Sequence, residues 1–270
     1  MEAAAKPVLL IGAGHMGGAL IAGWRLAGVL APDDLIVRDP SPGREALAAA
    51  AWGAALNGPG AALAAANTVV LAVGPAAWRQ AAEGIAPYLA KDAVVVSIVA
   101  GVAERELSAA FAGRPVARVM PTTAAAIGRC AASVWAKDVH ARRRAHALFE
   151  ALGAVVDLPR EEQLHAATGA CGSAPAYFYA LVEALQSAGA SAGLEPDAAR
   201  VLARGALTGA AALLEASGQD AGDLRREVAS PGGTTQAALG VLMGADGLGP
   251  LMERTVAAAV ARSMQLGASR

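Results

Sequence analysis

The chain has 270 residues, of which 55% are hydrophobic and 17% are charged, and its formal net charge is −1. This length allows one large domain or two smaller ones, and the near-neutral charge argues against nucleic-acid or membrane partners held by bulk electrostatics. The two cysteines are too few for a disulfide framework or a zinc site, so we expect a reducing compartment. With no signal-peptide pattern and no uninterrupted membrane-spanning run, the sequence predicts a soluble, cytoplasmic protein without a metal site.

The segment 7–18 carries the strongest local signal. The apolar residues 8–11 predict a buried strand, and Gly12, Gly14 and Gly17 follow at the G-x-G-x-x-G spacing before a run with helical period. Gly12 permits the turn, Gly14 leaves room for a pyrophosphate, and Gly17 lets the helix pack closely on the strand. The helix N-terminus presents free N–H groups to phosphates. The pattern favours a nucleotide cofactor over its alternative, a glycine-rich turn that binds nothing.

Strands and helices alternate in the first part of the chain. Further strands are predicted at residues 34–39, 68–73, 93–99, 115–120, 132–135 and 154–157, and helices at 43–51, 76–88 and 142–152. The continuously apolar strand 68–73 is typical of a parallel strand that is buried on both faces. The repeated strand–helix units predict an α/β fold with a Rossmann-like, doubly wound parallel sheet over residues 1–160.

From about Glu161 onwards the apolar pattern is helical, which predicts an all-α C-terminal domain over residues 161–270. Breaks are expected at residues 193–196, 218–220, 230–233 and 244–250. Asp197 is a predicted N-cap for a helix over 198–213, and Thr234 and Thr235 open a helix over 236–243.

Several motifs together resemble the Δ1-pyrroline-5-carboxylate reductases, which reduce a cyclic imine to L-proline with NAD(P)H in the last step of proline biosynthesis. The resemblance covers nearly the whole chain and rests on the segments 11–18, 96–102, 119–121, 172–177 and 228–235. The segment 228–235, Val-Ala-Ser-Pro-Gly-Gly-Thr-Thr, is the most specific of these. Periodicity alone predicts the two-domain plan, and the substrate is implied only by the resemblance.

The resemblance implies that the loop before residue 236 holds the substrate. Thr235 is the expected catalytic residue, because the matching threonine of the family bonds the imine nitrogen. The expected substrate-binding residues are Ser230, Gly232, Gly233, Thr234, Thr235 and Ser173. Taken alone, this segment would be interpreted as an ordinary Ser-Pro-Gly-Gly turn with Thr235 as a helix cap.

The cofactor is expected along the carboxyl ends of the strands, where open α/β sheets bind ligands. The expected cofactor-binding residues are Gly12, Gly14, His15, Met16, Gly17, Arg38, Asp39, Ser41, Asn57, Ala72, Val73, Ala100, Gly101, Pro121 and Thr122. Asp39 can bind a ribose 2′-OH and favours NAD, whereas Arg38 and Ser41 can hold a 2′-phosphate and favour NADP. The resemblance favours NADPH, with NADH as the alternative. Asn57 is equally well explained as a turn residue.

Four positions depart from the family pattern. Gly74 replaces a lysine, Thr122 an asparagine, Ala124 a proline and Ala174 a glycine. Such changes could alter the rate, select another small imine, or mark a nucleotide-binding paralogue without turnover, although the intact loop 230–235 argues against complete loss of activity. A related hydroxy-acid dehydrogenase is a further alternative. It is disfavoured because such enzymes supply a lysine from the helical domain, and all three lysines here precede Glu161.

The C-terminal half is rich in alanine, glycine and leucine, with little charge over residues 198–214. A single chain would leave much of this apolar helix surface uncovered, so a homodimer is predicted. The family also builds dimers into decamers. The sequence leaves open the larger assembly and the physiological direction of the reaction.

Overall fold

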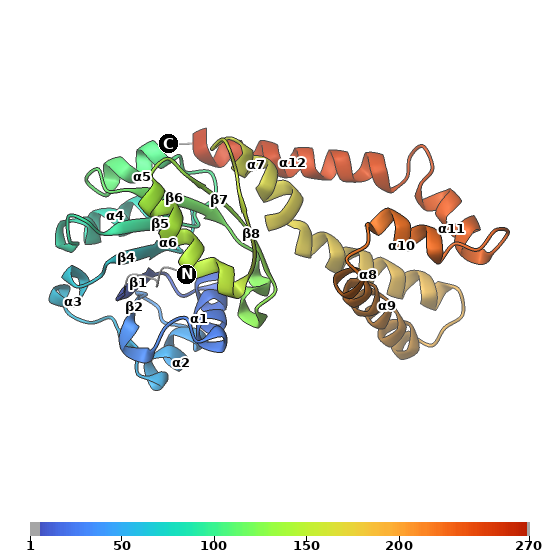
Figure 1. Cartoon of the computed structure of the whole chain (residues 1–270). Helices are drawn as coiled ribbons and strands as arrows, with labels where there is room; N and C mark the ends of the chain where they lie inside the picture. Colours follow the sequence, from blue (N-terminus) through green and yellow to red (C-terminus); the bar gives the residue numbers. More distant parts are fainter. Residues whose placement is uncertain (1–5, 269–270) are drawn as a thin grey trace. The chain divides into compact units, whose positions relative to one another are not determined.

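A computed structural model describes residues 6–268, which form two compact units (Figure 1). Unit 1 comprises residues 6–173 and 258–268, and unit 2 comprises residues 174–257. Residues 161–173 and the end of the last helix therefore pack in the same unit as the sheet.

The centre of unit 1 is an eight-stranded sheet in the order β3-β2-β1-β4-β5-β6-β7-β8. Its strands are β1 (Val8–Ile11), β2 (Leu35–Arg38), β3 (Ala55–Leu56), β4 (Thr68–Leu71), β5 (Val94–Ser97), β6 (Val116–Met120), β7 (Cys130–Ala136) and β8 (Gly153–Asp157). All seven strands expected from the sequence are confirmed, with β8 at the edge. The short edge strand β3 was not predicted, because two residues give no periodic signal.

The sheet is not wholly parallel, because β7 runs antiparallel to β6 while all other neighbours pair in parallel. A parallel neighbour needs a crossover of a dozen or more residues, usually containing a helix. Only the short 3-10 helix η3 (Thr123–Ile127) lies between β6 and β7. The chain therefore returns in the opposite direction, and the fully parallel arrangement that was predicted is wrong at this one pair.

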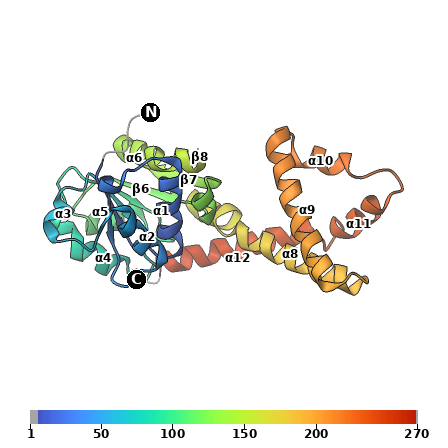
Figure 2. The same cartoon turned by 90° about the horizontal axis from the view of Figure 1, so that it is seen from below.

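Helices cover both faces of the sheet (Figures 1 and 2). Those of unit 1 are α1 (His15–Ala27), α2 (Arg44–Trp52), α3 (Gly60–Ala64), α4 (Trp78–Ile85), α5 (Glu104–Ala110), α6 (Val139–Phe149) and α7 (Gln163–Ala167), with 3-10 helices η1 (Pro32–Asp34), η2 (Ala86–Tyr88) and η4 (Glu150–Leu152) and the π-helix η5 (Thr168–Gly172). Successive side chains of a strand point to opposite faces, so Leu10 joins the core with α1, α2 and α6, while Leu9 joins the core with α3, α4 and α5. This double burial explains the continuously apolar strands.

Unit 2 is helical, as predicted from the pattern after Glu161. Its helices are α8 (Ala174–Ser191), α9 (Pro196–Ser217), α10 (Ala221–Glu227), α11 (Thr234–Leu242) and the first part of α12 (Leu248–Ala268). The prediction that Asp197 is an N-cap is wrong: the cap position is Glu195, and Asp197 lies in the first turn, where it pairs with Arg200 at 3.4 Å. Pro196 sets the start of the helix two residues earlier than predicted, because its fixed φ suits the first helical position.

Candidate functional site

The three glycines of the turn between β1 and α1 differ in how closely other atoms approach them. Gly12 has a φ of +89°, and a Cβ there would lie 2.8 Å from the carbonyl oxygen of Ala72. A Cβ at Gly17 would lie 2.1 Å from the carbonyl oxygen of Gly12. A Cβ at Gly14, by contrast, meets nothing within 4 Å. Two of the glycines are thus required for packing, and the third borders open space at the N-terminus of α1.

This turn lies at the switch point of the sheet. β1 pairs with β2 on one side and with β4 on the other, so the chain winds in opposite directions from here. Ligands of open α/β sheets bind in the crevice at this point, beyond the carboxyl ends of the strands. A cavity of about 610 Å³ opens there, lined by Gly12, Arg38, Asp39, Asn57 and Val73 among others.

Asp39 is held in a network of backbone hydrogen bonds just beyond β2. Its Oδ2 accepts a hydrogen bond from the N–H of Ala13 at 2.7 Å, and its Oδ1 accepts one from the N–H of Ser41 at 2.8 Å. Asn57 accepts a hydrogen bond from the Asp39 N–H at 3.0 Å and donates one to the Asp39 carbonyl at 2.8 Å. The carboxylate is thereby fixed against the glycine turn. Asn57 also has a φ of +51°, so it is a turn residue as well as a cavity residue.

The first residues of α1 border a second hollow of about 640 Å³, lined in part by Gly14, His15, Arg44 and Thr123. His15 is exposed, and Met16 is half-buried. The first N–H groups of a helix have no partner within it, so this end of α1 offers donors and a partial positive charge to an anion.

The residues expected farther along the sheet edge are more enclosed. Gly101, with a φ of +79°, is buried beneath α12: a Cβ there would lie 2.9 Å from the N of Gly267 and from the carbonyl oxygen of Ser263. Thr122 is buried, and its hydroxyl accepts a hydrogen bond from Ala131 N–H at 3.1 Å. The Thr122 side chain therefore faces β7. Ala100 is half-buried and Pro121 is buried.

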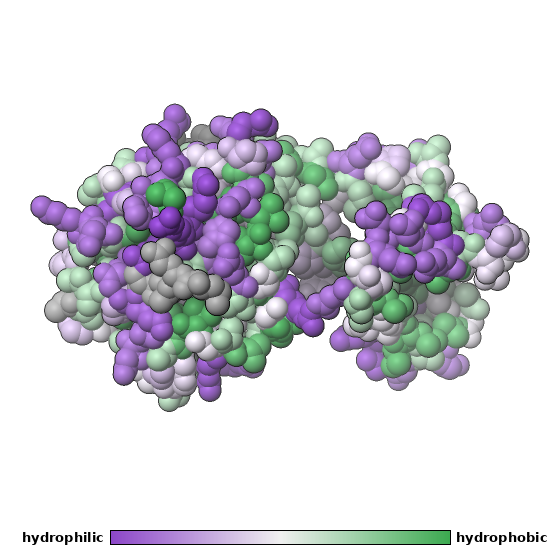
Figure 3. Space-filling view, viewed as in Figure 1, coloured by the Kyte–Doolittle hydropathy of each residue, from purple (hydrophilic) through white to green (hydrophobic). Residues whose placement is uncertain are grey.

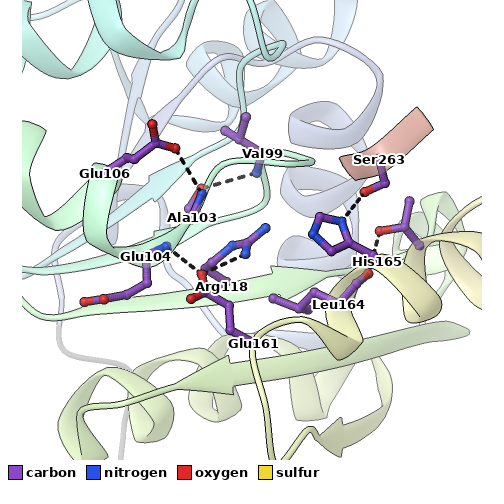
Figure 4. A network of polar contacts seen from close by, with 11 residues as sticks. Val99, Ala103, Glu104, Glu106, Arg118, Glu161, Leu164, His165 and Ser263 are labelled. Atoms are coloured by element: carbon purple, nitrogen blue, oxygen red, sulfur yellow. Dashed lines mark hydrogen bonds and ion pairs between the residues drawn. The ribbon is translucent and has the colours of Figure 1, made fainter. Parts of the chain in front are cut away.

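A network of polar contacts lies next to this edge (Figure 4). The buried Arg118 donates to the Glu161 carboxylate at 2.8 Å, and the same oxygen accepts a hydrogen bond from the Glu104 N–H at 2.6 Å. His165 contacts the Ser263 hydroxyl at 2.9 Å. Burial lowers the pKa of His165, and the charge of Arg118 lowers it further. The sequence analysis missed this network, although an arginine inside an apolar strand was a signal that a partner exists.

The loop before α11 is closed by its own hydrogen bonds. Gly233 is the N-cap of the helix, and its N–H donates to the Ser230 carbonyl at 3.0 Å. The Gly232 N–H donates to Oε1 of Gln236 at 2.6 Å. Gly232 and Gly233 are both expected substrate-binding residues, and the N–H group of each is already engaged within the loop. The N–H donors that remain are those of the first turn, from Thr234 onwards.

Thr234 is exposed and Thr235 is half-buried within unit 2. Within residues 6–268 the Thr235 hydroxyl has no hydrogen-bond partner, so it is available to donate. Ser173 belongs to unit 1, where its N–H donates to the Thr168 carbonyl at 2.8 Å. Over the same residues no cluster of histidine, cysteine and acidic side chains could hold a metal ion, and none of the helices is long and apolar enough to cross a membrane.

The glycine turn at the switch point of a mostly parallel sheet defines the class of dinucleotide-binding oxidoreductases. In agreement, the family model described as NADP oxidoreductase coenzyme F420-dependent matches residues 7–101. The model described as pyrroline-5-carboxylate reductase dimerisation matches residues 161–266.

Whole-chain comparisons identify the family. The pyrroline-5-carboxylate reductase of Pseudomonas aeruginosa is 36% identical over 266 residues, which are 96% of each chain. The chain belongs to the pyrroline-5-carboxylate reductase family.

Solved structures show the same fold. That of a pyrroline-5-carboxylate reductase from Coxiella burnetii has a TM-score of 0.87 at 27% identity and covers 97% of this chain and 98% of its own. That of Plasmodium falciparum pyrroline carboxylate reductase with NADP bound has a TM-score of 0.83 at 23% identity, covering 98% and 99%.

Proposed function

We propose that this protein reduces 1-pyrroline-5-carboxylate to L-proline with a reduced nicotinamide dinucleotide. The observation that carries the proposal is the 36% sequence identity between this protein and a pyrroline-5-carboxylate reductase over 96% of both chains.

The glycine turn fits a dinucleotide, because the space beside Gly14 is open and the cavity beyond β1 and β4 is lined by hydrogen-bonding groups. Gly14, His15 and Met16 would hold the pyrophosphate at the start of α1, and Asp39 would hold the adenosine ribose. When bound, the cofactor supplies the hydride. The resemblance favours NADPH.

On the substrate side, the loop before α11 would bind the imine acid. The first-turn N–H groups from Thr234 onwards, with the hydroxyls of Ser230 and Thr234, suit a carboxylate at a helix N-terminus. The free Thr235 hydroxyl would donate a hydrogen bond to the ring nitrogen and orient the imine carbon. Gly232 and Gly233 would shape the turn. Ser173, which directly precedes α8, is proposed as a further substrate-binding residue.

We propose that residues 161–270 also form the dimer contact, since the model for dimerisation matches 161–266. Large apolar side chains of unit 2 are exposed, including Phe178, Val201, Leu213 and Val241. Hydrophobic surface is visible over unit 2 in the view of Figure 3. Monomers rarely expose so much apolar surface, which supports a homodimer. Sedimentation velocity tests this and separates a dimer from a decamer.

A steady-state assay tests the reaction. Purified protein is mixed with the cyclic imine and either NADH or NADPH, and loss of cofactor absorbance is followed while proline is quantified separately. Matched oxidation of cofactor and formation of proline supports the proposal. Cofactor binding without turnover would instead favour a nucleotide-binding paralogue, and turnover of a hydroxy acid would favour the related dehydrogenases.

A further inference from the structure

The most constrained charged group of the cofactor cavity is the carboxylate of Asp39. One oxygen accepts a hydrogen bond from Ala13 in the glycine turn, and the other accepts one from Ser41 in the next loop. The Asn57 amide closes a two-way contact with the Asp39 backbone. Turning the Asp39 side chain away to admit another anion would break both of its carboxylate hydrogen bonds.

This carboxylate keeps unused acceptor capacity. Two carboxylate oxygens offer about four lone-pair sites, and the two backbone N–H groups occupy two of them. A ribose bearing a free 2′-OH can donate into the remaining sites. A 2′-phosphate cannot donate when fully ionised, and it would bring a second negative group next to a fixed one.

Of the two arginines nearest to Asp39 in the sequence, Arg38 already donates to a backbone carbonyl, and Arg44 lines the other hollow, at the start of α1, rather than this cavity. Arg38 is the only cation that lines this cavity within the described chain, and its Nη1 donates to the Gly58 carbonyl at 2.8 Å. Arg44 pairs with Glu45 at 3.1 Å, and its side chain is 93% exposed. The residue after Asp39 is Pro40, which offers neither a charge nor an N–H.

We infer that Asp39 is the specificity-determining residue of the cofactor site and makes this protein prefer NADH to NADPH. The kinetic test of this inference rests on the proposed function, because it needs turnover of the cyclic imine. The inference reverses the preference for NADPH that the resemblance favours. Its rival is a site in which Arg38, through its remaining N–H groups, and the Ser41 hydroxyl hold the 2′-phosphate.

The first test is the ratio of kcat/KM for NADH to that for NADPH with saturating cyclic imine. We expect a ratio of at least about 10, the size of effect that one close like-charge pair can produce. A ratio below 1 overturns the inference. This measurement needs no variant, so it does not depend on how a mutant folds.

A binding test separates this inference from the proposed reaction. The affinities of the unaltered protein for AMP and for adenosine 2′,5′-bisphosphate are measured by calorimetry at about 0.05 M and about 0.5 M NaCl. We expect AMP to bind more tightly than the bisphosphate. The difference between the two affinities should become smaller at high salt, because screening weakens the repulsion between Asp39 and the 2′-phosphate. The opposite outcome is that the bisphosphate binds more tightly than AMP and loses more affinity than AMP at high salt. That outcome would assign the 2′-phosphate to Arg38 and overturn the inference. If the imine is not reduced, these affinities still decide the cofactor inference.

Substitutions then locate the effect. Asp39→Asn and Asp39→Ser should each lower the NADH-to-NADPH ratio by about tenfold, and they should raise the affinity for the bisphosphate relative to AMP. The matched control is Asp33→Asn, which removes the same charge from an exposed position in η1. An unchanged ratio in folded Asp39 variants, or an equal change in Asp33→Asn, would contradict a role specific to Asp39.

Discussion

The guanidinium of Arg118 and the carboxylate of Glu161 form an ion pair of 2.8 Å whose side chains are only 6% and 22% exposed. The same Glu161 oxygen accepts the N–H of Glu104, which begins α5. One carboxylate therefore joins strand β6, the start of α5 and the segment before α7. These are the elements that flank the sheet edge beside Gly101.

We predict that Glu161→Gln lowers the free energy of unfolding by about 2–4 kcal/mol, because it leaves Arg118 buried without a counter-charge. Urea denaturation near neutral pH measures this. The control is Glu162→Gln: the neighbouring side chain is exposed, and its change should stay within about 0.5 kcal/mol. Equal effects of the two substitutions would show that the ion pair contributes nothing beyond net charge.

The glycine turn gives a second prediction. Gly14→Val should fold normally but lose most of its affinity for NADH and NADPH, because the new side chain enters the open space beside the start of α1. Gly17→Val should instead destabilise the fold, since its Cβ would lie 2.1 Å from the Gly12 carbonyl oxygen. Cofactor titration by fluorescence, together with thermal unfolding, distinguishes the two. If Gly14→Val binds the cofactors with wild-type affinity, the cofactor does not bind at this turn.

The contrast between those two glycines shows what the sequence could predict. The spacing of Gly12, Gly14 and Gly17 is local, and the flanking strand and helix follow from hydrophobic patterns within windows of about ten residues. The turn and the packing role of each glycine could therefore be predicted together. The Arg118–Glu161 contact joins residues 43 positions apart, and no local pattern names the partner. The direction of β7 likewise depends on the length of one connection rather than on the strand itself.

For the candidate site, too, local patterns predicted the residue types but not the contacts between distant residues. Residue types on the loop before α11 were recognisable, but their hydrogen bonds were not. The engagement of the Gly232 N–H by Gln236 depends on the rotamer of a long side chain. Thr122 was expected to face the cofactor because it follows β6. The hydrogen bond that its hydroxyl accepts from the Ala131 N–H depends on the antiparallel return of β7, which no local pattern of the sequence shows.

A third prediction concerns pH. His146 on α6 contacts Glu150 at 2.6 Å and Asp157 of β8 at 3.0 Å. Burial lowers the pKa of His146, but the hydrogen bonds and charges of Asp157 and Glu150 outweigh it, so the pKa is raised above 6.5. A raised pKa in the folded state means that this stabilisation is fully present below the unfolded pKa and is lost as pH rises through the folded value.

We therefore expect His146→Gln to destabilise the protein more at pH values below about 6 than at values above about 8.5, by up to about 1 kcal/mol for such a partly exposed cluster. Urea denaturation of both proteins at the two pH values measures the difference. His140→Gln, at an exposed position of the same helix, controls for the loss of an imidazole. A loss for His146→Gln that is independent of pH would exclude the charged imidazole as its source.

The last prediction separates catalysis from folding at Thr235. Its hydroxyl has no hydrogen-bond partner in residues 6–268, so Thr235→Ala should change the free energy of unfolding by less than about 0.5 kcal/mol. The same substitution should lower kcat/KM for the cyclic imine by about 10–100-fold, the loss expected for one hydrogen bond to the reacting nitrogen. Thr235→Ser keeps the hydroxyl and should recover most of the activity. If Thr235→Ala turns over like the wild type, or if Thr235→Ser is as impaired as Thr235→Ala, the hydroxyl has no part in activating the imine.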